Sequence, residues 1–306
     1  EKANGNIDRL IFYRLEAEGL EPSPPESPGR LLRRLSLALT GLPPTSSELD
    51  AFESAYDIDP KQAVENRVDD LLSQPGFGER WASMWLDLVR YADSGGLGQD
   101  QKRTIWAYRD WVVKAFNDDL PFDEFTVKQL AGDLLPDPSL DDLVATASQR
   151  NTQTNDEGGT DDEVFRVEAV VDRINTTWQT WGSMTFNCVQ CHDHPYDPFR
   201  HEEYYQFMTF FNNTADSDLQ KDEPLLKVPE NPNLYEETTE LIRRILELKE
   251  TFWEQGNTLK ASADWQHVKG LEVASNNSTQ YQVDDSAGYS EFQAVGTVEI
   301  KTHTNI

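Results

Sequence analysis

The stretch Cys188-Val189-Gln190-Cys191-His192 constrains this chain more than any other feature of its sequence. It contains both cysteines of the 306 residues, and a histidine directly follows the second cysteine. Scattering two cysteines and five histidines at random would give this pattern roughly once in ten thousand arrangements. Two thiols at this spacing can form thioethers with the two vinyl groups of one porphyrin, and the next histidine can then bind the iron as its proximal ligand. The spacing therefore predicts one covalent haem c at Cys188, Cys191 and His192.

Two other uses of these cysteines are a redox disulfide and a metal site. A thioredoxin-like C-x-x-C pair lies where a strand meets a helix in a βαβ unit, and this sequence has no such pattern. Zinc needs four ligands, usually as two well-separated pairs. Cys188, Cys191, His192 and His194 fall within seven residues, which is too short a stretch to surround one ion. Covalent haem is the favoured interpretation, and a disulfide or a metal site is the alternative.

The chain is strongly acidic. It has 27 basic and 55 acidic residues and a net charge of −28. Such a field disfavours binding to nucleic acid or to an anionic lipid surface. A redox partner that is basic, or that binds through cations, fits the charge better. Solubility at high ionic strength explains the same charge and is the simpler interpretation.

The ends and the hydropathy of the chain bear on its location. No run of eighteen apolar residues occurs, so no transmembrane segment is expected, and no signal peptide is recognisable at the start. The first residue is Glu1 and not methionine, which indicates a mature or trimmed chain. Because haem c is attached outside the cytoplasm, we expect a periplasmic or extracellular (cell-envelope) protein.

The hydrophobic pattern predicts a mainly α fold. Apolar residues recur at helical spacing, and strand-like alternation is not convincing before Asn213. The last long helix, over 163–186, would lead the chain into the haem motif. Helices are expected over 7–18, 31–40, a short segment capped by Ser46 or Ser47, 61–73, 79–91, 106–117, 123–130, 141–150, 163–186 and 202–212.

Composition divides the chain into four parts. Residues 1–213 are expected to form a multi-helix, cytochrome c-like domain wrapped around the haem. Residues 214–232 are polar and interrupted by prolines, which predicts a linker. Residues 233–256 predict an amphipathic helix, and its narrow apolar face within 235–254 suits a hairpin or a homodimer contact. Residues 257–306 predict a short β-rich segment, part of a truncated further domain.

The position of the motif suggests that haem belongs to the core of the helical domain. The motif follows nearly all the helices that would surround the ring. Removing a large apolar ring would leave a cavity. Replacing Cys188 and Cys191 by alanine is therefore expected to give largely unfolded protein. The alternative is that the aromatic-rich helices pack without haem.

Residues 6–214 share many short phrases with one family. They are Ile7-Asp8-Arg9, Arg33-Arg34-Leu35-Ser36-Leu37, Thr40-Gly41-Leu42-Pro43-Pro44, Gly78-Glu79-Arg80-Trp81, Trp85-Leu86-Asp87, Arg90-Tyr91-Ala92-Asp93-Ser94, Tyr108-Arg109-Asp110-Trp111, Gln129-Leu130-Ala131-Gly132-Asp133, Glu157-Gly158-Gly159, Arg166-Val167-Glu168, Val171-Asp172-Arg173, and Cys191-His192-Asp193-His194 closing on Asp197-Pro198. In these the chain resembles the planctomycete-type cytochrome c domain, long catalogued as a domain of unknown function. The resemblance implies haem c and electron transfer in secreted or envelope proteins, but no demonstrated reaction. Relatives usually continue into a β-rich segment and a further C-terminal domain.

The sixth position on the iron has seven candidates, which are Met84, Met184, Met208, His194, His201, His267 and His303. His194 is only two residues from His192, too close to reach round the ring. By resemblance, Met184 and Met208 stand where relatives carry Leu, Ile or Phe, which indicates core positions. Met84 stands where many relatives carry histidine, so it is the predicted sixth ligand. A core role for Met84 and an open or otherwise filled site remain as alternatives.

Other side chains have weaker functional interpretations. Arg109, Arg166 and Arg173 could neutralise haem propionates, and surface ion pairing explains them equally well. An acidic glycine loop could hold Ca²⁺, but its spacing is not that of an EF-hand, and a solvated acidic loop is the favoured interpretation. Its acidic residues are Asp156, Glu157, Asp161 and Asp162.

These observations predict an electron carrier rather than an enzyme. It would hold one haem on Cys188 and Cys191, with His192 proximal and Met84 distal, and exchange electrons with a partner. The alternative is a haem enzyme with an open sixth site, such as a peroxidase or an oxidase acting on polysaccharide. A third interpretation is a structural module whose haem mainly holds the fold together.

Overall fold

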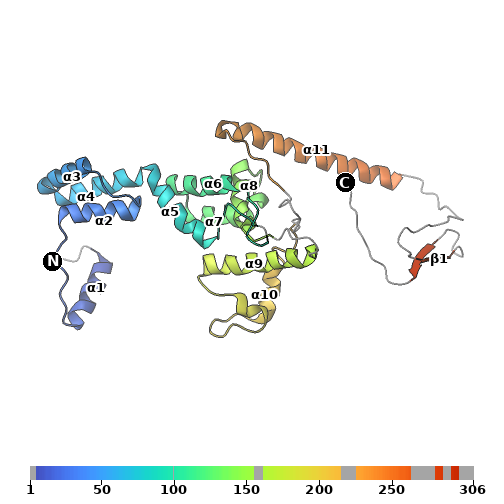
Figure 1. Cartoon of the computed structure of the whole chain (residues 1–306), viewed down its shortest axis with the longest axis horizontal. Coiled ribbons are helices and arrows are strands. Elements are labelled where there is room, and N and C mark those ends of the chain that lie inside the picture. Colours follow the sequence, from blue (N-terminus) through green and yellow to red (C-terminus); the bar gives the residue numbers. More distant parts are fainter. Residues whose placement is uncertain are drawn as a thin grey trace. The chain divides into compact units, whose positions relative to one another are not determined.

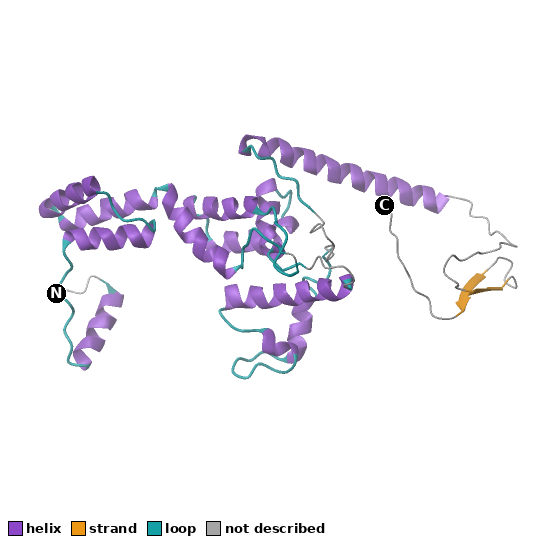
Figure 2. Ribbon diagram, viewed as in Figure 1, coloured by secondary structure: helices purple, strands orange, loops and turns teal. Residues whose placement is uncertain are grey.

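The computed structural model describes residues 5–98, 100–154, 161–214, 225–262, 280–284 and 291–295. Over these residues the chain is mainly helical, as the sequence predicts (Figure 1 and Figure 2). It divides into two compact units, Glu1–Leu241 and Ile242–Ile306. Among the described residues, no helix is both long and apolar enough to cross a membrane.

The first unit contains ten α-helices within its described residues, together with short 3₁₀ turns and the start of an eleventh helix. Most boundaries fall within a few residues of those that the sequence predicts. The helices are α1 (Asn6–Ala17), α2 (Pro28–Leu39), α3 (Ser46–Ile58), α4 (Pro60–Leu72), α5 (Pro75–Leu88), α6 (Trp106–Asn117), α7 (Phe122–Ala131), α8 (Leu140–Ala145), α9 (Asp162–Gly182), α10 (His201–Met208) and α11 (Tyr235–Ser262), and the 3₁₀ turns are η1 (Gly132–Leu134), η2 (Thr146–Arg150), η3 (Asn187–Gln190) and η4 (Pro232–Leu234).

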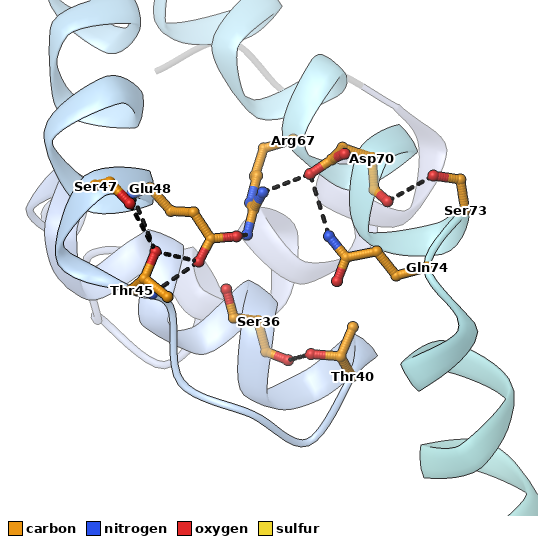
Figure 3. A network of polar contacts seen from close by, with 9 residues as sticks. All are labelled: Ser36, Thr40, Thr45, Ser47, Glu48, Arg67, Asp70, Ser73 and Gln74. Atoms are coloured by element: carbon orange, nitrogen blue, oxygen red, sulfur yellow. Dashed lines mark hydrogen bonds and ion pairs between the residues drawn. The ribbon is translucent and has the colours of Figure 1, made fainter.

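Helices α2, α3 and α4 pack around a small apolar centre. Leu32, Phe52 and Ala63, one from each helix, are all buried there. A polar network closes one end of this bundle (Figure 3). Thr45 begins α3 with a capping box, because its hydroxyl accepts from the Glu48 amide and the Glu48 carboxylate accepts from the Thr45 amide.

Arg67 of α4 joins this network to the rest of the bundle. Its guanidinium contacts the Glu48 carboxylate at 2.6 Å and the Asp70 carboxylate at 2.5 Å. The hydrogen bonds from Thr45, followed by the contact with Arg67, lower the pKa of Glu48 to about 2. The ion pair between α3 and α4 therefore requires an ionised Glu48.

Helices α5, α6 and α7 pack around a second, aromatic centre. The Trp85 ring lies 4.9 Å from the Phe125 ring, and the Trp111 ring stacks on Phe125 at 5.4 Å. Gln129 is fully buried among these rings, and its Oε1 accepts from both Trp85 Nε1 and Tyr108 Oη. The sequence marks the aromatic residues as core but does not reveal that an amide joins them.

Gly78 allows α5 and α6 to approach closely. A Cβ atom at this position would lie 2.4 Å from the carbonyl oxygen of Val113 on α6. The Gly78 amide donates instead to the side-chain oxygen of Asn117 at 2.8 Å. Glycine is thus required here by contact between the helices and not by its backbone dihedrals.

Helices α9 and α10, with η3 between them, enclose a third centre. The buried members of this α9–α10 cluster share contacts with a ring of partly buried aromatic and sulfur-containing side chains. The buried members are Val170, Ile174, Phe186, Val189, Tyr204 and Phe211, and the partly buried ones are Trp178, Met184, Cys188, Phe199, Phe207 and Met208.

Two helix predictions need correction. The helix predicted over 163–186 ends at Gly182, because Ser183 adopts a left-handed conformation with φ of 54° and terminates it. The segment 141–150 is helical throughout, but it divides into α8 and the tighter turn η2. The first difference lies at an element end, where apolar periodicity carries little information. The second lies within the predicted helix, where the chain tightens from an α-helix to a 3₁₀ turn.

The packing bears on the expectation of helices wrapped around haem, which stays a prediction. Among the described residues, α2–α7 surround aromatic and aliphatic residues of their own. Cys188 belongs to the edge of the α9–α10 cluster, and Cys191 and His192 are exposed. Haem attachment would therefore concern one region of the helical unit and not its whole core.

The second unit begins inside α11. This helix continues to Ser262, so the segment predicted as β-rich from residue 257 starts as helix. Two strands, β1 (Gln280–Asp284) and β2 (Glu291–Val295), pair antiparallel with Tyr281 opposite Ala294. This single pair does not support a β-rich segment, and the remaining residues after 262 lie outside the described part.

Candidate haem attachment site

A tight turn brings the three motif residues together. After α9 the chain enters η3, where the Val189 amide donates to the Phe186 carbonyl at 3.0 Å. The amides of Cys191 and His192 then both donate to the Cys188 carbonyl, at 3.2 and 3.3 Å. This folding places Cys188, Cys191 and His192 on one short loop.

Both cysteines are free thiols. Cys188 is half-buried, and its thiol makes a weak contact, 3.7 Å long, with the Thr185 carbonyl. Cys191 is exposed. The two thiols therefore occur in different surroundings, one against the α9–α10 cluster and one at the surface.

The ring of His192 has a defined tautomer. Its Nδ1 lies 2.7 Å from the Asp193 carbonyl oxygen. Because a carbonyl can only accept, Nδ1 carries the proton and donates it. In the neutral ring Nε2 then keeps its lone pair, and the ring is exposed. An imidazole held in this way by a backbone carbonyl is the usual form of a histidine that binds a metal.

His194 has a different role from His192. Its side chain is only 8% exposed, and its Nδ1 accepts from the amides of Tyr196 and Asp197 at 3.3 and 2.9 Å. The Asp197 carboxylate lies 3.2 Å from the same nitrogen, but two N–H donors leave no room for a proton there. Nδ1 is therefore occupied as an acceptor, and His194 holds the loop that follows the motif.

Residues of helix α10 form hydrogen bonds with the motif and with Asp193, which follows it. His201 Nδ1 donates to the Val189 carbonyl at 2.9 Å, and the His201 amide donates to the Asp193 carboxylate at 2.7 Å. The Tyr205 hydroxyl donates to the Gln190 carbonyl at 3.0 Å. Sequence reasoning missed these three hydrogen bonds, because nothing in the motif indicates which later residues contact it.

Aromatic side chains pack together beside Cys188. The Trp178 ring lies 4.7 Å from Phe186, 4.9 Å from Phe199 and 5.4 Å from Phe207. Its Nε1 is buried and has no hydrogen-bond partner among the described residues. Buried indole N–H groups usually find an acceptor, and the described residues provide none for this one.

These residues fit a covalently attached haem. Two free thiols at the required spacing lie on one turn with a histidine whose Nε2 lone pair is free. An apolar, aromatic surface with one unsatisfied donor adjoins the half-buried thiol. Over the described residues, no three His, Cys, Asp or Glu side chains gather as a metal site.

The structure places Met84 on α5, where it is half-buried. This helix reaches α9 through Trp85, whose ring lies 5.3 Å from Trp181. Just beyond α5, Arg90 forms a bidentate pair with Asp172 of α9, with both contacts at 2.6 Å. The methionines that pack against the cluster beside Cys188 are Met184 and Met208. The assignment of Met84 as sixth ligand stays a prediction.

The other sequence candidates have structural partners. Arg109 pairs with Asp110 at 2.7 Å, and Arg166 pairs with Glu163 at 2.7 Å. Arg173 is buried and donates to the Gln149 carbonyl and the Thr214 hydroxyl. Of the acidic loop, Asp161 caps α9 by accepting from two amides, whereas Asp156 and Glu157 lie outside the described residues.

A cavity of about 500 Å³ lies away from these residues, beside α6, α8 and η2. Its walls combine aliphatic side chains with polar and charged ones, and no pattern in the sequence predicts it. None of the motif residues lines it. Lining residues include Arg103, Ile105, Leu143, Val144, Arg150 and Leu226.

Comparison with known protein families shows to which family the chain belongs. Residues 6–216 match the family described as PSCyt2, a protein of unknown function (DUF1549). The chain belongs to this family. The matched region of this PSCyt2 chain contains α1–α10 and the whole C-x-x-C-H motif, and it ends before α11. No curated protein and no solved structure matches the chain.

Proposed function

We propose that this chain is a c-type cytochrome domain that carries one covalent haem and exchanges electrons with a partner protein. The observation that supports it best is the hydrogen bond from His192 Nδ1 to the Asp193 carbonyl. It leaves Nε2 as a ready ligand on the same turn as two free thiols. Cys188 and Cys191 would form the thioethers, and His192 would be the proximal ligand.

The chain's own residues would orient the attached group. The Asp193 carbonyl fixes the plane of the His192 ring. His201 and Tyr205 hold two carbonyls of the loop between the cysteines, Val189 and Gln190, so the thiols keep their spacing. Haem iron would supply a one-electron couple between its ferric and ferrous states.

A location and a partner follow from the same proposal. Haem c is attached outside the cytoplasm, so the domain would work in the periplasm, the cell envelope or the extracellular space. A net charge of −28 favours a partner that is basic or that binds through cations. An electron carrier of this kind needs no catalytic residues of its own.

Covalent attachment is tested by mass spectrometry of the denatured, mature protein. One haem should stay bound through denaturation, and acid-acetone extraction should leave it on the chain. The matched control is Cys188→Ala with Cys191→Ala, which should lose all covalent haem. If extraction removes all haem from the parent protein, the proposal is wrong.

The sixth ligand decides between a carrier and an enzyme. We propose Met84, and Met184 and Met208 compete with it because both adjoin the cluster beside Cys188. Each is replaced by alanine in turn. The ligand's variant should turn low-spin ferric haem high-spin and admit cyanide, while the other two variants keep the parent spectrum. High-spin parent protein that binds peroxide quickly would favour the haem enzyme instead.

A further inference from the structure

The C-terminal helix carries an apolar seam. Leu241, Ile245, Leu248 and Phe252 follow one another on α11 at spacings of four, three and four residues. These are the spacings of heptad positions a and d, which meet a partner helix in a coiled coil. Each of the four side chains is more than half exposed. We call these four residues the α11 seam.

Packing of a partner helix against the α11 seam would bury its exposed apolar side chains. α11 is 28 residues long and runs without interruption (Figure 1). Most helical stability in proteins comes from burying an apolar face against a neighbour, and the seam residues of α11 are more than half exposed. A second helix laid along the seam would bury all four side chains at once. The same heptad positions continue to Thr238 before the seam and to Gln255 after it.

The seam is complementary to a second copy of itself in the antiparallel direction. With Ile245 opposite Leu248 of the second copy, the heptad geometry puts Leu241 opposite Phe252. It also puts Thr238 opposite Gln255. Apolar residues thus meet apolar ones, and the two polar positions meet each other at both ends.

Charges beside the seam decide the orientation. In a parallel pair, position g of one helix faces position e of the other five residues later, which sets Arg244 against Lys249 twice. In the antiparallel register, Arg244 faces Thr251 instead. Lys249 then faces Ile242, on which its methylene stem can pack. Antiparallel dipoles also attract each other, whereas parallel ones repel.

We propose that the α11 seam pairs two copies of this chain through an antiparallel two-helix coiled coil. The interface belongs to α11 alone and does not depend on haem attachment. It would join two cytochrome domains in one molecule and give the assembly two redox centres.

Two leucines of α11 provide a matched test. Leu248 lies in the seam and is 54% exposed, whereas Leu246 lies outside it and is 55% exposed. The full chain is measured by sedimentation equilibrium. The parent and Leu246→Ser should both be dimers of a 34.9 kDa chain. Leu248→Ser enters the antiparallel interface twice, so its dissociation constant should rise by at least about a hundredfold. Circular dichroism shows that the variant stays helical.

Each contrary result overturns the proposal. A monomeric parent chain would show that no second copy of the chain packs against the α11 seam. Equal weakening by Leu246→Ser and Leu248→Ser, or no weakening by either, would show that the dimer forms elsewhere. Lys249→Glu tests the orientation without touching the seam. In an antiparallel pair the dissociation constant should stay within about threefold, whereas several-fold tighter binding would show a parallel pair.

Discussion

Gln129 illustrates how one residue joins the helices of the central cluster. Its side chain is fully buried, and Oε1 accepts from Trp85 Nε1 at 2.9 Å and from the Tyr108 hydroxyl at 2.7 Å. Two donors on two helices thus depend on a single oxygen from a third. Both donors are bulky and buried, so neither can turn to water when that oxygen is lost.

At this scale we predict that Gln129→Leu lowers the free energy of unfolding by about 3 kcal/mol, because two buried donors lose their acceptor. Tyr108→Phe removes one donor and leaves Gln129 bonded to Trp85, so it should cost only about 1 kcal/mol. Urea unfolding of both variants measures the difference. A smaller loss for Gln129→Leu than for Tyr108→Phe would contradict this account.

At the scale of elements, the contact between α3 and α4 is sensitive to pH. Hydrogen bonds from Thr45 and the Arg67 guanidinium lower the pKa of Glu48 to about 2 in the folded protein, from an ordinary value of 4.5. A lowered carboxyl pKa stabilises the fold above the ordinary value, and this contribution is lost as pH falls from about 4.5 towards 2.

Glu48→Gln tests this prediction. The side chain of Glu48 is 32% exposed, so solvent screening reduces its contribution to about 1 kcal/mol. Between pH 5 and pH 2 the parent should lose about that much more stability than the variant. Glu202, which pairs with Arg200 at the surface, supplies the control position. If Glu48→Gln and Glu202→Gln show equal acid profiles, the network in Figure 3 has no such role.

At the scale of the whole molecule, packing between side chains stabilises the groups of helices. The α2–α4 bundle has a centre of its own, and α5–α7 share the aromatic cluster around Phe125. Within the described residues, Cys188 of the C-x-x-C-H motif packs against the α9–α10 cluster. If haem is attached there as proposed, its loss should disturb α9 and α10 and leave α2–α7 folded.

The variant Cys188→Ala with Cys191→Ala measures this. Its far-ultraviolet circular dichroism should keep most of the parent signal, and it should melt cooperatively at a modestly lower temperature. This differs from the expectation that removing the cysteines unfolds the chain, which assumed a core built around the ring. A fully unfolded variant would restore that expectation.

The sequence already contained much of the candidate site. The spacing of Cys188, Cys191 and His192 is a local property, so it predicts haem attachment without any structure. Helix positions followed from apolar periodicity for the same reason, and only ends such as that of α9 at Gly182 were missed. Features that depend on residues close together in the sequence can be predicted from the sequence alone.

Other features depended on contacts between segments distant in the chain. The ties from His201 and Tyr205 to the motif, and the joint role of Gln129, require the folded arrangement. So does the location of Met184 and Met208, rather than Met84, at the cluster beside Cys188. By itself the sequence determined which residues can carry the chemistry. Only the tertiary structure decided which side chains surround them, because packing joins residues that no local pattern relates.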